Sequence, residues 1–197
     1  MKKTAFCILL SALCSAVNAQ GFLPPASTST LSWAESSHPL LVGEKVPESL
    51  AVMDESGKSR TFLSYKSPTE VLVAVFFSAR CDADKTQWPV LRRLHERYKG
   101  WRVAPLAVSA SPQETLPELS DLLQRQKLPW PAVRDEGKTA ASLLKISAAL
   151  EAVIIDEYGV LRYRGPVARA SQALDAVIGH IDTVKEPDLS IVGGCSL

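Results

Sequence analysis

The chain has 197 residues, a length that predicts one domain with at most a short appendage. Apolar residues make up 46% and charged residues 22%, which is ordinary for a soluble globular protein and excludes a disordered or collagen-like chain. Lysine and arginine number 22 against 21 acidic residues, so a net charge of +1 gives no electrostatic case for nucleic acid or an anionic membrane as partner. Four cysteines are too few for a disulfide-rich scaffold.

The first nineteen residues have the layout of a secretory signal peptide. Lys2 and Lys3 precede a short apolar run from Ala5 to Val17, and small residues at positions 17 and 19 form a cleavage site. The run is shorter than the roughly 20 residues that a membrane-spanning helix needs. We therefore expect cleavage after Ala19, a periplasmic or secreted protein, and no membrane span in the mature chain. An uncleaved anchor is the alternative.

Removal of this segment leaves two cysteines, because it contains Cys7 and Cys14 while Cys81 and Cys195 remain. Lipid attachment at Cys14 is disfavoured by the bulky Leu13 directly before it. An exported protein works in an oxidising compartment, where thiols tend to pair. The first question about the mature protein is thus whether its two cysteines meet.

The mature chain divides into three parts. Residues 20–40 are rich in proline, serine and threonine without periodicity, which predicts a flexible leader. Residues 41–184 carry alternating strand and helix patterns and form the predicted domain. Residues 185–197 form a C-terminal tail that carries Cys195.

The domain begins with two short strands, 50–53 and 60–63, around a turn-forming run of acidic residues, serine and glycine. The unbroken run Val71 to Phe77 predicts a strand buried on both faces. Helical spacing follows from Asp82 to Tyr98, and Pro89 indicates a kink or a delayed start. Further strands are expected at 101–109, 132–134, 152–156 and 160–164, and further helices at 111–126, 139–144 and 171–184.

This order predicts an α/β fold, in which parallel strands joined by helices and closed by an antiparallel hairpin give a central mixed sheet with helices on both faces. Four segments add a resemblance to the alkyl hydroperoxide reductase/thiol-specific antioxidant group of thioredoxin-fold redoxins. They are VGEKVPESLAVMDESGKSRTFLSY, VLVAVFFSARC, LPWPAVRDEGKTAASLLKI and VIIDEYGVLRYRG. The resemblance implies a thioredoxin-like fold with Cys81 as the active-site cysteine.

Cys81 follows the buried strand and is expected to begin the next helix. Unpaired N–H groups and the helix dipole favour a thiolate there, and the thiolate is the form that attacks a disulfide or peroxide. Arg80 favours the thiolate further, whereas Asp82 and Asp84 oppose it. An inert small residue in a loop is the alternative reading of Cys81.

The sequence departs from the patterns of both families of redoxin. In the thioredoxin pattern Trp-Cys-x-x-Cys, Arg80 replaces the tryptophan and Asp84 the second cysteine, so a local dithiol cannot form. In the peroxiredoxin pattern Pro-x-x-x-Thr/Ser-x-x-Cys, Ser78 fits but Ala74 replaces the proline. Leu150 stands where the resemblance implies a cis-proline, and we expect a trans bond there, because a cis bond before a non-proline residue costs about 2.5–4 kcal/mol.

Peroxidase chemistry also needs an arginine above the peroxide. Arg162 and Arg164 are the candidates, and the alternative is that both are solvated on one face of the hairpin. The three histidines, His38, His95 and His180, lack the spacing of metal ligands, so we expect no metal and no cofactor.

The tail ends in Gly193-Gly194-Cys195-Ser196-Leu197, and two glycines let the backbone before Cys195 adopt unusual dihedral angles. Some exported redoxins with one motif cysteine resemble this arrangement. We expect a Cys81–Cys195 disulfide; a purely structural bridge and a dimer cross-link remain open.

The leading hypothesis is an exported thiol–disulfide oxidoreductase, in which Cys81 attacks and Cys195 resolves, acting on protein disulfides or thiols of the cell envelope. A redox-inactive thioredoxin-fold interaction module is the main alternative, and a peroxidase is less favoured.

Overall fold

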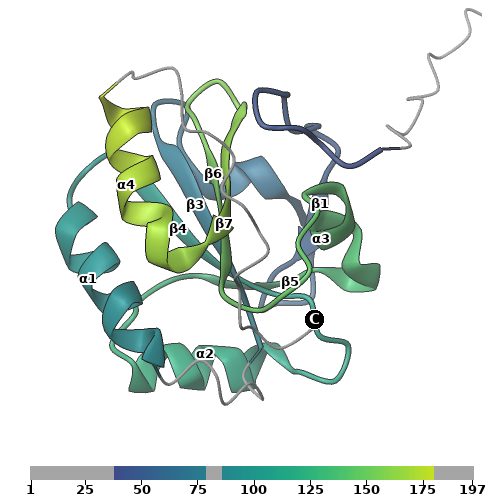
Figure 1. The fold of residues 1–197 in the computed structure, drawn as a ribbon. Helices are drawn as coiled ribbons and strands as arrows, with labels where there is room; N and C mark the ends of the chain where they lie inside the picture. Colours follow the sequence, from purple (N-terminus) through teal and green to yellow (C-terminus); the bar gives the residue numbers. More distant parts are fainter. Residues whose placement is uncertain (1–37, 79–85, 180–197) are drawn as a thin grey trace, which may run out of the picture. The chain divides into compact units, whose positions relative to one another are not determined.

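The computed structural model describes residues 38–78 and 86–179 (Figure 1). All of them belong to one compact unit, which starts at residue 36. The strands are β1 (Ala51–Met53), β2 (Ser59–Thr61), β3 (Val71–Phe77), β4 (Val103–Ser109), β5 (Ala132–Arg134), β6 (Glu151–Ile155) and β7 (Leu161–Pro166). The helices are α1 (Trp88–Tyr98), α2 (Leu116–Arg125), α3 (Thr139–Leu143) and α4 (Val167–Ile178), with two 3-10 turns, η1 (Phe62–Tyr65) and η3 (Glu136–Lys138).

The strands form one mixed sheet in the order β2-β1-β5-β4-β3-β6-β7. β3 lies between β4, with which it pairs in parallel, and β6, with which it pairs antiparallel. β5 continues the parallel part beside β4, and β7 closes the antiparallel hairpin with β6. Parallel neighbours need crossover connections, which α1 and α2 supply. The predicted α/β class and mixed sheet are confirmed.

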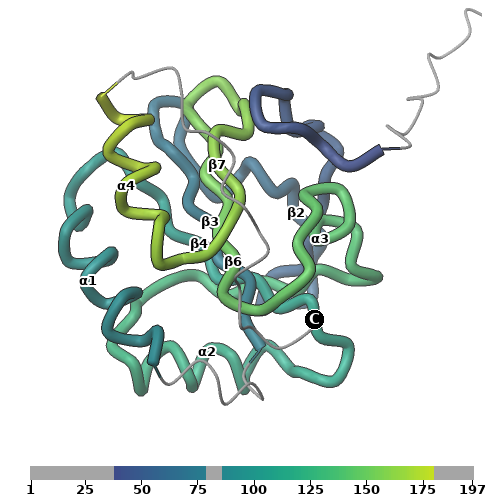
Figure 2. The backbone as a smooth tube through the Cα atoms, viewed as in Figure 1, coloured from purple at the N-terminus to yellow at the C-terminus, as the bar shows by residue number. Residues whose placement is uncertain are grey.

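Both faces of the sheet are covered, as the sequence predicted (Figure 2). All seven residues of β3 are buried, and they alternate between two cores. Val73, Val75 and Phe77 pack on one face with residues of α1, α2 and α4. Leu72 and Phe76 pack on the other face with α3 and η1. The unbroken apolar run of β3 follows from this burial on both sides.

Two helices start at residues other than those predicted, and local hydrogen bonds are formed at both starts. α2 begins at Leu116, and the start predicted at Ser111 was wrong. The Thr115 hydroxyl accepts from the Glu118 N–H at 3.3 Å, and the Glu118 carboxylate accepts from the Thr115 N–H at 2.7 Å, which is a capping box. α4 begins at Val167 rather than at Ser171, and the Val167 N–H, which has no acceptor within the helix, donates to the Leu150 carbonyl oxygen at 2.9 Å.

Other elements lie close to their predicted places. α1 begins at Trp88, so Pro89 lies in its first turn and marks the delayed start that the sequence indicated. The second predicted strand, 60–63, is observed at Ser59–Thr61, and η1 begins at the next residue, Phe62. α4 ends at Ile178, while the predicted helix ran on to residue 184. The predicted signal peptide, the leader up to residue 37 and the tail 185–197 lie outside the described residues. Within 38–78 and 86–179, no helix is long and apolar enough to cross a membrane.

Candidate active site at the carboxyl edge of the sheet

Neither predicted catalytic cysteine is among the described residues. Cys81 falls within 79–85 and Cys195 within 180–197. The described residues that bracket Cys81 are Ser78, which follows β3, and Thr86, which precedes α1. The candidate site is therefore defined by the groups that surround the end of β3 and the start of α1.

Three parallel strands end side by side where the chain leaves β3. Phe77 is the register partner of Ser109 in β4, and Ser109 is the register partner of Arg134 in β5. We call this end of the three strands the carboxyl edge. Sites in open α/β sheets lie outside the carboxyl ends of the strands. The chain that runs from Phe77 toward Cys81 starts at such an edge.

A buried polar cluster occupies the carboxyl edge. Ser109 and Glu114 are 0% and 1% exposed, and the Ser109 hydroxyl donates to Glu114 Oε2 at 2.6 Å. The Arg134 guanidinium donates to the Glu114 carbonyl oxygen, and the Asp135 N–H donates to the Ser109 carbonyl oxygen at 2.8 Å. A hydroxyl bonded to a carboxyl group can hold or pass a proton. The sequence analysis missed this cluster, although Ser109 ends an otherwise apolar strand.

An aromatic cluster fixes both ends of the segment that carries Cys81. Phe77, the last residue of β3, stacks on Trp88, the first residue of α1, with ring centroids 5.7 Å apart and planes 10° apart. Trp130 meets Phe77 edge-on at 6.3 Å, and its indole N–H donates to His95 Nδ1 at 3.2 Å. Since Trp88 is 6% exposed and Phe77 is fully buried, this contact holds the start of α1 against the end of β3.

The loop before β6 lies beside the same edge. The Leu150 N–H donates to the Phe76 carbonyl oxygen at 2.7 Å. Leu150 has a φ of 65°, and no cis peptide bond occurs anywhere in the described ranges. The trans bond that the sequence predicted before Leu150 is confirmed. The positive φ gives this loop a backbone that a proline, whose φ is held near −65°, cannot adopt.

Neither arginine proposed for peroxide binding lies at the carboxyl edge. Arg162 Nε pairs with Asp156 Oδ2 at 2.6 Å, beside the turn of the β6–β7 hairpin. Arg164 is 1% exposed, so the expectation that it is solvated was wrong. Its Nη1 donates to the carbonyl oxygens of Leu40 and Leu144 at 2.9 and 3.3 Å.

Burial lowers the pKa of the Arg164 guanidinium, and the nearby Glu151 carboxylate partly opposes that shift. Among the described residues, an arginine that does lie at the carboxyl edge is Arg134, which the sequence analysis did not single out. Its Nε is buried and has no hydrogen-bond partner in the described parts of the chain.

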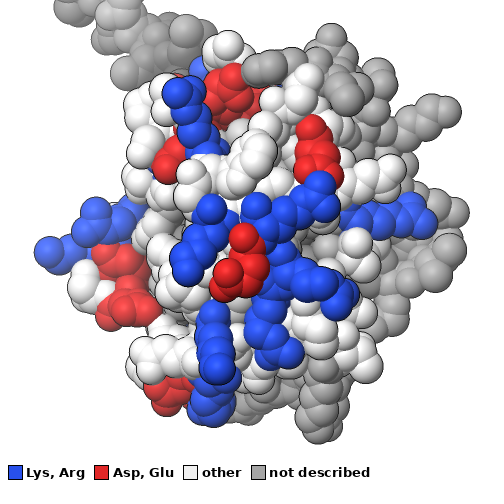
Figure 3. Space-filling model, turned by 90° about the vertical axis from the view of Figure 1, so that its left-hand side faces the viewer, with Lys and Arg blue, Asp and Glu red and all other residues white. Residues whose placement is uncertain are grey.

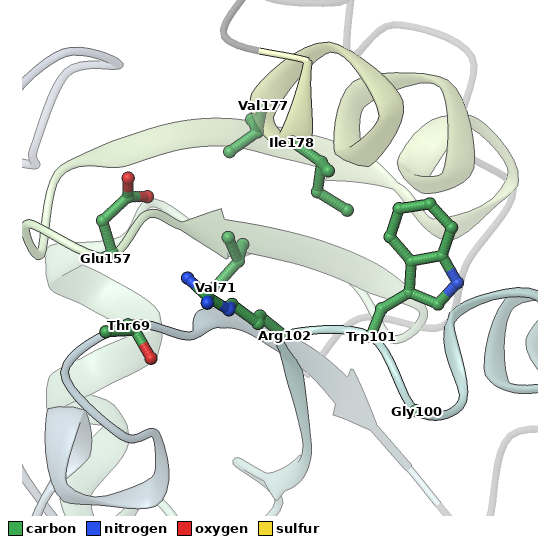
Figure 4. A pocket seen from close by; sticks show the side chains of 8 residues that line it. All are labelled: Thr69, Val71, Gly100, Trp101, Arg102, Glu157, Val177 and Ile178. Atoms are coloured by element: carbon green, nitrogen blue, oxygen red, sulfur yellow. The ribbon is translucent and has the colours of Figure 1, made fainter.

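A cavity of about 440 Å³ lies at the opposite end of β3 (Figure 4). Trp101, which is 58% exposed, stands on one side of it. Val71 lines this cavity and Phe77 lies at the carboxyl edge, so about 20 Å of strand separates the two. The cavity is therefore not part of the candidate active site. The full lining is Thr69, Val71, Gly100, Trp101, Arg102, Glu157, Val177 and Ile178.

Across the two described stretches, no group of three histidine, cysteine or acidic residues is arranged to hold a metal ion.

The order of the strands and the helices on both faces of the sheet give the chain a thioredoxin-like α/β fold. A comparison with protein-family profiles matches residues 42–164 to the AhpC/TSA family. The match spans more than half of the chain, and the chain belongs to the AhpC/TSA family. The resemblance that the sequence carried is thereby confirmed at the level of family and fold.

Solved structures share this fold at low sequence identity. One is the hypothetical protein SMc02350 from Sinorhizobium meliloti 1021, with 20% identity, a TM-score of 0.65, and coverage of 81% of this chain and 94% of that one. Another is a thiol:disulfide interchange protein from Bacteroides sp., with 15% identity, a TM-score of 0.54, and coverage of 71% and 91%. A mutant of PrxQ from Xylella fastidiosa has 15% identity, a TM-score of 0.57, and coverage of 73% and 98%. A comparison with curated proteins found no match.

Proposed function

We propose that the protein is a thiol–disulfide oxidoreductase that uses Cys81 as its attacking thiolate and Cys195 as its resolving cysteine. One observation carries the proposal: Ser78 directly follows β3 at the carboxyl edge, and Cys81 comes three residues later in the sequence. Three residues span at most about 10 Å, so chain length alone keeps Cys81 near this edge. Arg80 beside it favours the thiolate.

The proposed reaction has two exchange steps. The Cys81 thiolate attacks one sulfur of a partner disulfide, which forms a mixed disulfide and releases the other partner sulfur as a thiolate. The Cys195 thiolate then attacks Cys81 in the mixed disulfide, which forms Cys81–Cys195 and releases the second partner thiolate. The partner is reduced and this protein is oxidised. The reverse sequence oxidises a partner dithiol, and another dithiol or disulfide resets the protein.

The length of the C-terminal segment supports the role of Cys195. Ile178, the last residue of α4, lines the cavity at the far end of β3 from the carboxyl edge. Cys195 comes sixteen residues after Gly179, a stretch that reaches at most about 55 Å. β3 is seven residues long, or about 23 Å. The segment is long enough for Cys195 to return to the carboxyl edge.

We also infer that the protein is exported and acts on protein thiols or disulfides of the cell envelope. The support is the signal-peptide layout of residues 1–19 and the two cysteines that remain after its removal. The mass of the protein recovered from the periplasm or medium tests this. A chain that starts at Gln20 is the expected result, and a chain that keeps its first nineteen residues would contradict it.

The exchange activity is tested on the exported protein with insulin and with glutathione disulfide as substrates. Cys81→Ser is expected to abolish turnover, whereas Cys195→Ser is expected to accumulate a mixed disulfide on Cys81. Non-reducing peptide mapping of the oxidised protein is expected to find the Cys81–Cys195 peptide pair. Equal turnover by the wild type and Cys81→Ser would remove Cys81 from the mechanism. Rapid loss of the Cys81 thiol with peroxide alone would indicate a peroxidase instead.

A second candidate, a redox-inactive interaction module, is favoured by the loop before β6. Leu150 lies there with a φ of 65° and a buried side chain, where the redoxin pattern has a proline that helps to present backbone to a partner disulfide. Arg80 and Asp84 depart from the thioredoxin pattern as well. This candidate predicts no turnover and no mixed disulfide in Cys195→Ser, so the same experiment separates the two functions.

A further inference from the structure

Basic side chains gather on the outer side of α1 and on the adjoining end of α2 (Figure 3). We call this surface the basic face. All of its basic residues are exposed, and Glu96 is the acidic residue among them on α1. They are Arg92, Arg93, Arg97, Lys99, Arg125 and Lys127. The inner side of α1, with Leu91, Leu94 and Tyr98, is buried against the sheet, so the helix turns its charged side outward.

A hydrogen bond joins the two helices within this surface. Arg92 Nη1 donates to the side-chain oxygen of Gln126, which directly follows α2, at 2.9 Å. The basic residues of α1 and of the end of α2 therefore form one continuous surface.

Most of these charges are not neutralised within the domain. Arg97 pairs with Asp175 at 2.7 Å. Arg93, Lys99, Arg125 and Lys127 have no acidic partner within ion-pair distance in the part of the chain that the structure describes. Unpaired charges of one sign raise the local potential and steer oppositely charged partners.

The basic face concentrates positive charge on one side of the domain, although the chain as a whole is nearly neutral. Its six basic residues and Glu96 contribute +5 to a net charge of +1, so the rest of the chain carries −4. An extended polyanion such as a nucleic acid would also meet that negative remainder. A compact acidic patch on a protein would meet only the basic face. The charge distribution therefore favours an acidic protein over a nucleic acid.

The basic face also adjoins the candidate active site. Trp88, the first residue of α1, stacks on Phe77 at the carboxyl edge, and Arg92 and Arg93 come one turn later. At 1.5 Å per residue they lie about 6–8 Å along the helix from Trp88. A stable protein complex buries about 800 Å² on each partner, so a protein docked at the carboxyl edge would extend over these residues.

We propose that the basic face docks the acidic surface of the protein whose disulfide Cys81 attacks, an inference that rests on the proposed function. Complementary charge acts mainly on the rate of encounter and on the choice among partners. The protein would thus react fastest with disulfides that are flanked by acidic residues.

The test compares two cysteine-linked peptides of equal length, one flanked by glutamates and one by lysines, as disulfide substrates of the reduced protein. At about 20 mM salt the acidic peptide is expected to react roughly 10-fold faster, and the ratio is expected to fall toward 1 at about 0.5 M salt because screening shortens the reach of the charges. Arg93→Glu/Lys99→Glu is expected to remove the preference. Lys58→Glu/Lys145→Glu makes the same charge change at exposed positions away from the basic face and is expected to retain it.

A second measurement separates failure of this inference from failure of the proposed function. A cysteine-free glutamate-rich peptide is expected to bind the full protein, with binding lost in Arg93→Glu/Lys99→Glu. If neither peptide disulfide reacts, the proposed oxidoreductase fails, while this binding still decides whether the basic face docks acidic protein. Equal exchange rates without such binding would overturn the docking proposal. Stronger binding of a single-stranded oligonucleotide or of phosphatidylglycerol vesicles than of the acidic peptide at 150 mM salt would overturn it too.

Discussion

The buried pair of Ser109 and Glu114 is expected to behave as one energetic unit. The Ser109 hydroxyl donates to Glu114 Oε2 at 2.6 Å, and each residue is at most 1% exposed. A hydrogen bond to a charged group contributes about 1.5–3 kcal/mol, and a buried polar group left without its partner costs about 1–3 kcal/mol. Ser109→Ala is therefore expected to lower the free energy of unfolding by about 2 kcal/mol. Glu114→Ala is expected to cost about 3 kcal/mol, since it also removes buried volume.

The double variant Ser109→Ala/Glu114→Ala tests the coupling directly. Either single variant already breaks the hydrogen bond between Ser109 and Glu114, so the second substitution cannot break it again. The double variant is therefore expected to be about 1–2 kcal/mol more stable than the sum of the two single losses implies. Urea unfolding of the wild type, the two single variants and the double variant, followed by circular dichroism, gives the loss of unfolding free energy in each variant. Ser142→Ala, at an exposed position on α3, serves as the control and is expected to stay within about 0.5 kcal/mol of wild type. A coupling below about 0.5 kcal/mol would refute the pair as a unit.

Three further substitutions test other parts of the domain. Hydrogen bonds, first that from the Ser56 hydroxyl at 2.6 Å, hold the pKa of the Asp54 carboxyl below its ordinary value. This contribution to stability is present above the unfolded-state pKa of about 4 and is lost as the pH falls toward the folded-state pKa. Asp54→Asn should therefore reduce the decline of the urea midpoint with falling pH. An unchanged decline would contradict this. Trp88→Ala should cost about 3–5 kcal/mol in urea unfolding and the exposed Trp101→Ala less than about 1 kcal/mol; similar losses would contradict the stacking argument. Lys145 has a φ of 54° in the left-handed region. Lys145→Gly should raise the melting temperature by about 1–2 °C, because relief of about 1–2 kcal/mol of left-handed strain outweighs the greater entropy that glycine gives the unfolded chain. A lower melting temperature would count against this.

The fold was predictable wherever burial imposes a periodicity on the sequence. Val71 to Phe77 reads as a continuous apolar strand because both faces of β3 are covered, and the structure gives the predicted bounds. The inner stripe of α1 was likewise visible from its spacing. The start of α2 was missed because it depends on the bonds between Thr115 and Glu118, which leave no trace in apolar periodicity. Local side-chain chemistry, and not hydrophobic pattern, decided that boundary.

The candidate site was predictable only in part, because its described members come together through strand register. A cysteine after a buried strand is a local signal, so the sequence alone singles out Cys81, whose role stays a prediction. Ser109, Glu114 and Arg134 belong to separate segments that the pairing of β3, β4 and β5 brings to one edge. Arg164 illustrates the same limit, since its acceptor Leu40 precedes it by 124 residues.

The loop before β6 offers a test of whether one substitution can restore the usual redoxin sequence. Leu150 has a φ of 65° and donates its N–H to the Phe76 carbonyl oxygen at 2.7 Å, and a proline would lose that bond and force φ toward −65°. Leu150→Pro and the control Leu150→Gly both remove the buried side chain, but glycine keeps the N–H and accepts the positive φ. We therefore expect Leu150→Pro to be less stable than Leu150→Gly by about 2–3 kcal/mol in urea unfolding, from the lost hydrogen bond and the displaced backbone. If the proline variant equals the glycine variant, the backbone at Leu150 is not fixed by its hydrogen bond to β3, and the loop is free to take the usual redoxin shape.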